Sequence, residues 1–167
     1  MSWKIEICRA KPNPVGKDRA AWGSPRQEQL LGEWVDLRNI GDTPVTLSTI
    51  HLGDIEFSQN CIPAKNSTIY WKGSSTQSLS PQQILRVHAG KSLYSSSMLD
   101  EDRVGAHLHA YAEKGNFVLN NRCGDVISVW WIGNDGKWHE EDKANYDPNL
   151  PEGAILTRVG SKLIPSR

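Results

Sequence analysis

The stretch from Glu33 to Asp54, EWVDLRNIGDTPVTLSTIHLGD, decides the fold. Apolar side chains alternate with polar ones on both sides of a break at residues 41–44, in the order Val35, Leu37, then Val45 and Leu47. Period-two alternation is typical of strands with one buried face, and Gly, Asp and Pro interrupt regular structure. The stretch therefore predicts a hairpin whose polar residues occupy the turn and a solvated face. It places no nucleophile beside a base, which favours a scaffold over a reaction.

The same stretch resembles the lamin tail domain, the immunoglobulin-like β-sandwich of nuclear lamins and many bacterial proteins. The positions that carry the resemblance are Glu33, Trp34, Val35, Asp36, Leu37, Asn39, Gly41, Asp42, Val45, Leu47 and Asp54. Weaker similarity follows at residues 57–71, 119–127 and 135–136. The resemblance implies a bacterial-type stand-alone domain that makes protein contacts and sometimes weak DNA contacts. Thr49-Ile50 replaces the family's usual Gly-aromatic pair, so the core there must be filled differently.

Short strands separated by turns are predicted along the rest of the chain, at residues 3–8, 55–57, 68–71, 85–88, 117–119, 126–132 and 137–141. Their spacing favours an all-β protein, an antiparallel immunoglobulin-like β-sandwich with two long loops and a C-terminal extension. The sandwich domain spans residues 1–146, and the extension, residues 147–167, packs on it or trails from it. Asp135-Gly136 predicts a tight hairpin turn. The shared core is predicted to contain Val35, Leu37, Val45, Leu47, Ile69 and Val126 or Ile127.

The composition predicts a soluble, intracellular domain. Nineteen basic and nineteen acidic side chains cancel, so nucleic-acid binding is possible but not favoured without a local patch. No apolar run is long enough for a signal peptide or a membrane span, which indicates a cytoplasmic location. The three cysteines, Cys8, Cys61 and Cys123, form no CxxC pair, so reduced thiols are expected rather than a disulfide framework or a zinc ribbon.

Two connections, residues 9–32 and 89–116, are long enough to carry a binding function. The second contains a predicted short helix at residues 98–104, an acidic run at 100–102, and the pair His107 and His109. Two histidines could chelate a metal if His51, His88 or Asp100 approached them, but structural zinc takes about four protein ligands. We therefore expect hydrogen-bonded loop histidines, a solvated acidic bend, no metal and no cofactor.

Seven tryptophans are the remaining candidates for a site. Trp130 and Trp131 are adjacent on one strand, so they must point to opposite faces and at most one can enter the core. Trp34 raises the same question, because Val35 and Leu37 are the expected inward residues of its strand. An outward tryptophan is either covered by a loop or the tail, or forms an exposed platform for a partner.

No catalytic motif is visible, so the sequence predicts a non-enzymatic binding or scaffolding module that contacts another protein. The alternatives are a carbohydrate-binding β-sandwich that uses exposed tryptophans, or a weak nucleic-acid or metal-binding domain. The candidate binding residues are Trp34, Trp130, Trp131, His107 and His109. The sequence leaves the oligomeric state open.

Overall fold

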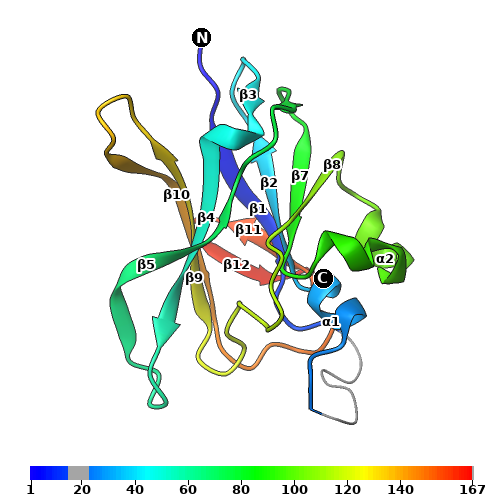
Figure 1. The fold of residues 1–167 in the computed structure, drawn as a ribbon. Helices are drawn as coiled ribbons and strands as arrows, with labels where there is room; N and C mark the ends of the chain where they lie inside the picture. Colours follow the sequence, from blue (N-terminus) through cyan, green and yellow to red (C-terminus); the bar gives the residue numbers. More distant parts are fainter. Residues whose placement is uncertain (15–22, 167) are drawn as a thin grey trace.

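A computed structural model describes residues 1–14 and 23–166 and shows an all-β protein built on one curled ten-stranded sheet (Figure 1). The strand order is β5-β4-β9-β10-β12-β11-β1-β2-β7-β8. The bounds are β1 (Ile5–Lys11), β2 (Trp34–Asn39), β4 (Ile50–Phe57), β5 (Pro63–Lys72), β7 (Ile84–His88), β8 (Leu108–Tyr111), β9 (Asp125–Ile132), β10 (Trp138–Tyr146), β11 (Leu156–Val159) and β12 (Lys162–Pro165). A separate pair is formed by β3 (Val45–Thr46) and β6 (Ser78–Leu79).

The helices are short and lie in the connections. They are α1 (Gln27–Gly32), α2 (Asp100–Arg103) and the 3-10 turns η1 (Leu47–Thr49) and η2 (Ser92–Ser97). The helix predicted at residues 98–104 is thus present as α2. Part of the long connection at residues 9–32 falls on residues 15–22, outside the described residues. Among the helices described, none has the length and apolar character needed to cross a membrane.

The hairpin predicted within residues 33–54 does not form, because its two strands pair with other strands. β2 lies between β1 and β7, while β3 pairs with β6. The chain leaves the sheet after β2 because the Asn39 side chain donates to the carbonyls of Thr43 (2.8 Å) and Leu79 (3.0 Å). Its Oδ1 accepts from the amide of Gly41 at 3.0 Å, which closes the turn on itself. The alternation identified the inward side chains correctly, but it carries no information on which strand becomes the neighbour.

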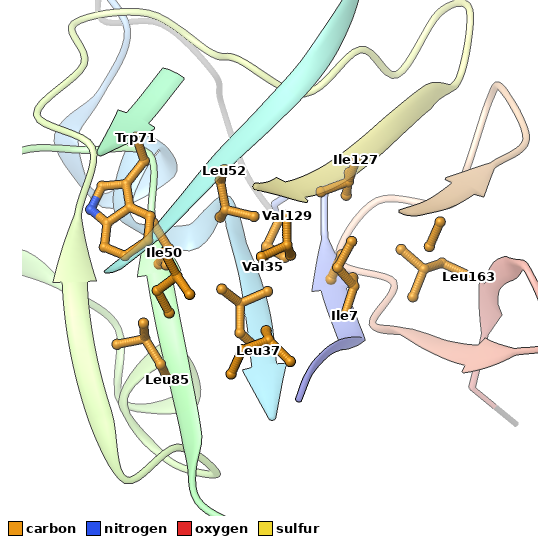
Figure 2. Packing of buried hydrophobic residues seen from close by; sticks show 14 of the residues in the cluster. Ile7, Val35, Leu37, Ile50, Leu52, Trp71, Leu85, Ile127, Val129 and Leu163 are labelled. Atoms are coloured by element: carbon orange, nitrogen blue, oxygen red, sulfur yellow. The ribbon is translucent and has the colours of Figure 1, made fainter. Parts of the chain in front are cut away.

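The core fills the concave side of the sheet with aliphatic and aromatic side chains from strands far apart in sequence (Figure 2). Val35, Leu37, Val45, Leu47 and Ile127 all belong to it, as the sequence predicts.

Ile69 is an exception among the predicted core residues: it is half-buried and outside the core, whereas Trp71 is inside it. The register of β5 against β4 shifts between Leu52 and Gly53, which leaves Tyr70 as an extra residue. Such a bulge changes which side chains face inward. The inward assignment of Ile69 is therefore wrong because the sequence does not reveal the bulge.

The β9–β10 hairpin is confirmed. Gly136 adopts a φ of +77°, and its amide donates to the carbonyl of Gly133 at 2.9 Å. The strand predicted at residues 117–119 is absent. The amides of Val118 and Leu119 donate to the Glu33 carboxylate, at 2.8 and 3.2 Å, instead of to a neighbouring strand.

The sheet is mixed and not purely antiparallel, because β8 runs parallel to β7 and β12 parallel to β10. The segment after residue 146 contributes β11 and β12, which join β10 to β1. Arg158 holds this junction through two bonds to the Asp142 carboxylate (2.7 and 3.0 Å) and one to the Ile7 carbonyl (3.0 Å). Residues 156–165 thus lie within the main sheet.

Two of the three cysteines are paired, which corrects the expectation of reduced thiols. Cys61, in the turn between β4 and β5, forms a disulfide with Cys123, in the loop before β9. Cys8 is buried and not part of a disulfide. The two bonded cysteines are 62 residues apart, a spacing without a recognisable motif.

Candidate binding site

The face of the sheet that points away from the core carries an open groove of about 490 Å³, across β5, β9 and β10. We call it the aromatic groove, and it is lined by Asn66, Ser67, Ile69, Trp130 and Trp138. Its volume falls within the range of about 300 to 1,000 Å³ that is typical of small-ligand sites. Of the sequence-predicted site residues, only Trp130 is among the five that line it.

The strand register places the two indoles on this face. Trp130 stands opposite His51 of β4 and Glu140 of β10. Trp138 stands opposite Ile132, which is two residues from Trp130 and therefore on the same side of β9. Trp138 is missing from the sequence-predicted set, although its place after the Asp135-Gly136 turn would have paired it with Ile132.

Both indoles are held by the protein. The Nε1 of Trp130 donates to the hydroxyl of Ser128 at 2.7 Å, and this hydroxyl donates to the hydroxyl of Ser67 at 3.2 Å. Trp138 packs edge-on against His51, with ring centroids 5.3 Å apart. Trp138 is nevertheless 42% exposed. The groove therefore presents preorganised aromatic surface to solvent.

Gly53 lies on β4, between the strands that carry Ile69 and Ser128. A Cβ at this position would stand 3.2 Å from the Ser128 hydroxyl and 3.3 Å from Cδ1 of Ile69. Both distances are tighter than ordinary van der Waals contacts. The missing side chain leaves room on β4 for the Ser128 hydroxyl and the Ile69 side chain, which come from the two neighbouring strands.

Trp131 lies on the other face from Trp130, as the sequence predicts. It stacks on His139 with ring centroids 4.3 Å apart and meets Trp3 edge-on at 6.0 Å. Trp131 is half-buried by these neighbours and does not line the groove. Trp130 and Trp131 therefore belong to two separate aromatic clusters, one on each face of the sheet.

Trp34 is buried, which corrects its assignment as an exposed binding residue. Its side chain is 1% exposed, its Nε1 donates to Asp102 at 2.9 Å, and the Arg86 guanidinium lies 3.7 Å from its ring. The alternation correctly turned Trp34 away from the core. The connection after β7 covers it, an outcome that the sequence left open as one of two possibilities.

The outer face of β2 is expected from the sequence to be solvated, but in the structure it is covered. It belongs to a buried charged layer formed by Arg9, Lys11, Asp36, Arg86 and Asp102. Asp36 accepts two bonds from Arg86 (2.7 and 2.9 Å) and pairs with Arg9 (2.9 Å). Arg86 also donates to the carbonyls of Asp102 (3.1 Å) and Val104 (2.7 Å). The charged layer therefore anchors the loop over the sheet.

The acidic run at residues 100–102 is solvated only in part. Asp100 and Glu101 are exposed, but Asp102 is buried and pairs with Lys11 at 2.7 Å. The expectation of a fully solvated acidic bend is corrected for this residue. Its carboxylate is the part of the charged layer that comes from the loop after β7.

His107 and His109 form hydrogen bonds with different partners. The Nδ1 of His107 accepts from the Ile84 amide at 3.0 Å. His88 bonds the Leu31 carbonyl through Nδ1 (2.6 Å) and the Nδ1 of His109 through Nε2 (2.8 Å). Because a carbonyl can only accept, His88 carries its proton on Nδ1 and His109 donates to it. Burial lowers the pKa of His88 to about 3, which keeps it neutral.

The described residues contain no group of three or more His, Cys, Asp and Glu side chains suited to a metal ion. Of the third ligands considered for His107 and His109, His51 packs against Trp138. His88 is buried against the Leu31 carbonyl, and Asp100 is exposed. The histidine pair thus has structural hydrogen-bond partners.

Three carboxyl groups form a second buried polar cluster: Glu33, Asp54 and Asp125. Burial raises the pKa of Glu33 to about 8, although bonds from Val118 and Leu119 act in the opposite direction. Burial and the neighbouring Asp125 raise the pKa of Asp54 to about 7, and burial raises the pKa of Asp125 to about 6. The cluster holds residues 118–120, because Asp125 also accepts from the Asn120 amide at 3.0 Å.

Raised carboxyl pKa values predict lower stability at alkaline pH. Glu33 ionises near pH 4.5 when unfolded and near pH 8 when folded, so its contribution is complete below pH 4.5 and is lost as the pH rises through about 8. The unfolding free energy should therefore fall as the pH rises from about 4.5 to about 8, and level off above pH 8, in urea titrations at a series of pH values. Glu33→Gln should flatten this dependence, whereas Glu140→Gln, at an exposed position, should leave it unchanged. An equally steep fall in Glu33→Gln would contradict the assignment.

The sequence matches no protein-family model, and no curated protein matches it. Support for a function therefore comes from the geometry of the aromatic groove.

Proposed function

We propose that this chain is a non-catalytic binding module whose ligand contacts run through the aromatic groove. The observation that carries the proposal is the pair of indoles, Trp130 and Trp138, which are held by protein contacts yet open to solvent. Aromatic rings supply large contact area with few rotatable bonds, so rings that are already held lose little entropy when a ligand binds. Exposed aromatic surface in a groove is typical of such sites.

The polar residues of the chain support a structural rather than a catalytic role for the remaining candidates. Glu33, Asp36 and Asn39, three positions of the lamin-tail-like stretch, are buried and engaged in hydrogen bonds that hold loops to the sheet. We extend the proposal to the finer fold assignment, in which the curled sheet is a variant of the immunoglobulin-like sandwich of lamin tail type. On this view the resemblance concerns fold formation, and the groove is the part that acts.

Affinity capture tests this function. The wild-type protein and Trp138→Ala, each immobilised, are incubated with extract of the native host, and bound proteins and carbohydrates are both quantified. We expect a ligand that is retained by the wild type and lost from Trp138→Ala, because the indole supplies contact area that alanine lacks.

The matched control is Ile164→Ala, which removes an apolar side chain of the same exposure (41%) from β12. It should retain the ligand. Identical bound material on wild type and Trp138→Ala would overturn the proposed function. Purified protein should also show no turnover of ester, phosphoester, nucleic-acid or glycoside substrates.

A further inference from the structure

We propose that the ligand of the aromatic groove is a neutral carbohydrate chain, stacked through its sugar rings on Trp130 and Trp138. The inference rests on the proposed binding function and adds the chemical class of the ligand. Three properties of the groove carry it: which parts of the indoles are free, which polar groups are unpaired, and the absence of charge among the lining residues.

Trp130 offers its ring face to a ligand rather than its polar edge. The Nε1 of Trp130 is already bonded to Ser128, so this ring cannot use its donor on a ligand without losing that bond. An indole face is a flat, electron-rich surface that attracts polarised hydrogen atoms. The C–H faces of a pyranose ring match this surface in shape and polarity.

Two polar side chains border the rings. Within the described residues, the Asn66 side-chain amide has no hydrogen-bond partner, so its two donors and its acceptor are available. The Ser67 hydroxyl accepts from Ser128, which leaves its own hydrogen free to donate. Sugar hydroxyls both donate and accept, so adjacent hydroxyls can satisfy an amide and a hydroxyl together.

The five residues that line the groove contain no ionisable side chain. A phosphorylated, sulfated or nucleic-acid ligand would require lysine or arginine to replace its counterions. The net charge of the chain is zero, so the protein adds no overall electrostatic attraction for a charged ligand. The groove is therefore complementary to a neutral ligand.

A proline-rich peptide is the competing neutral occupant, since such peptides also dock in aromatic grooves. Proline lacks a backbone N–H and offers mainly carbonyl acceptors. Such a peptide could bond the two donors of the Asn66 amide but offers few donors for its acceptor oxygen. A hydroxyl-rich ligand can bond both the donors and the acceptor, so the polar border of the groove favours carbohydrate.

Titrations with defined oligosaccharides test the inference. The probes are neutral hexasaccharides of β-1,4-linked glucose, β-1,4-linked N-acetylglucosamine, β-1,4-linked xylose and α-1,4-linked glucose, followed by tryptophan fluorescence and calorimetry. We expect saturable binding of at least one probe, with little change between low and high salt because stacking carries no net charge.

Variants assign that binding to the groove. Trp138→Ala should weaken it at least about tenfold, and Asn66→Ala should weaken it about threefold to tenfold. Ile164→Ala should bind as the wild type does. Trp138→Phe should recover part of the affinity, which an effect on folding alone would not require, and circular dichroism should show all four variants folded.

Absence of binding to all four hexasaccharides would overturn the carbohydrate assignment, as would binding that Trp138→Ala leaves unchanged. Saturable binding of a proline-rich decapeptide that depends on Trp138, without any hexasaccharide binding, would reject carbohydrate and leave the proposed function standing. If affinity capture is also insensitive to Trp138→Ala, the inference and the proposed function both fail.

Discussion

Replacing Arg86 with methionine is expected to lower the unfolding free energy by about 3 to 5 kcal/mol, measured by urea denaturation. Arg86 is 1% exposed, and its guanidinium makes two bonds to Asp36. Methionine fills much of the same space but leaves the Asp36 carboxylate buried, with only the partly exposed Arg9 beside it. Removing one partner of a buried pair is costly because the remaining charge keeps its desolvation penalty.

The same substitution should loosen the loop after β7. Arg86 donates to the carbonyls of Asp102 and Val104, so its loss leaves these groups without that donor. We expect faster amide hydrogen exchange around residues 100–105, beyond the change in global stability. Protection of this segment that matches the wild type would show that the charged layer does not anchor it.

Two controls define the effect. Lys162→Met removes one partner of an exposed pair with Asp147, and it should cost no more than about 1 kcal/mol because solvent screens such pairs. The double variant Asp36→Leu, Arg86→Met should lose less than the sum of the two single variants, because it leaves neither charge behind. A loss of a few tenths of a kcal/mol in Arg86→Met would contradict the burial of the pair.

Removing the Cys61–Cys123 disulfide is the second large perturbation. Because the two cysteines are 62 positions apart, loop-closure entropy predicts a loss of about 4 kcal/mol in the Cys61→Ser, Cys123→Ser variant. The bond joins the β4–β5 turn to the loop before β9, and Arg122 supports it by donating to the Gln59 carbonyl at 2.7 Å. Urea denaturation with and without a reducing agent measures the effect.

The variant itself provides the control. Reducing agent should destabilise the wild type and leave the doubly substituted protein unchanged, since the latter has no bond to cleave. Titration of thiols in the unfolded, unreduced wild type should find one free cysteine, Cys8. Three free thiols would show that the pair is not bonded in the isolated protein.

The sequence by itself determined the all-β class, the inward residues of several strands and the β9–β10 hairpin. These features are local, because the alternation of Val35 with Leu37 follows from the pleat of one strand and Asp135-Gly136 favours one turn. The opposite orientations of Trp130 and Trp131 follow from the same geometry. Such properties depend on a few adjacent residues and need no knowledge of the partner strand.

Tertiary structure alone decided what covers each face and which strands pair. Asp36 and Trp34 resemble residues of a solvated face, and they are buried because Arg86 holds the loop after β7 over them. The disulfide and the groove likewise join residues more than 60 positions apart, such as Ile69 and Trp130. These contacts form only when the whole sheet is assembled, so they cannot be predicted from any short stretch of the sequence.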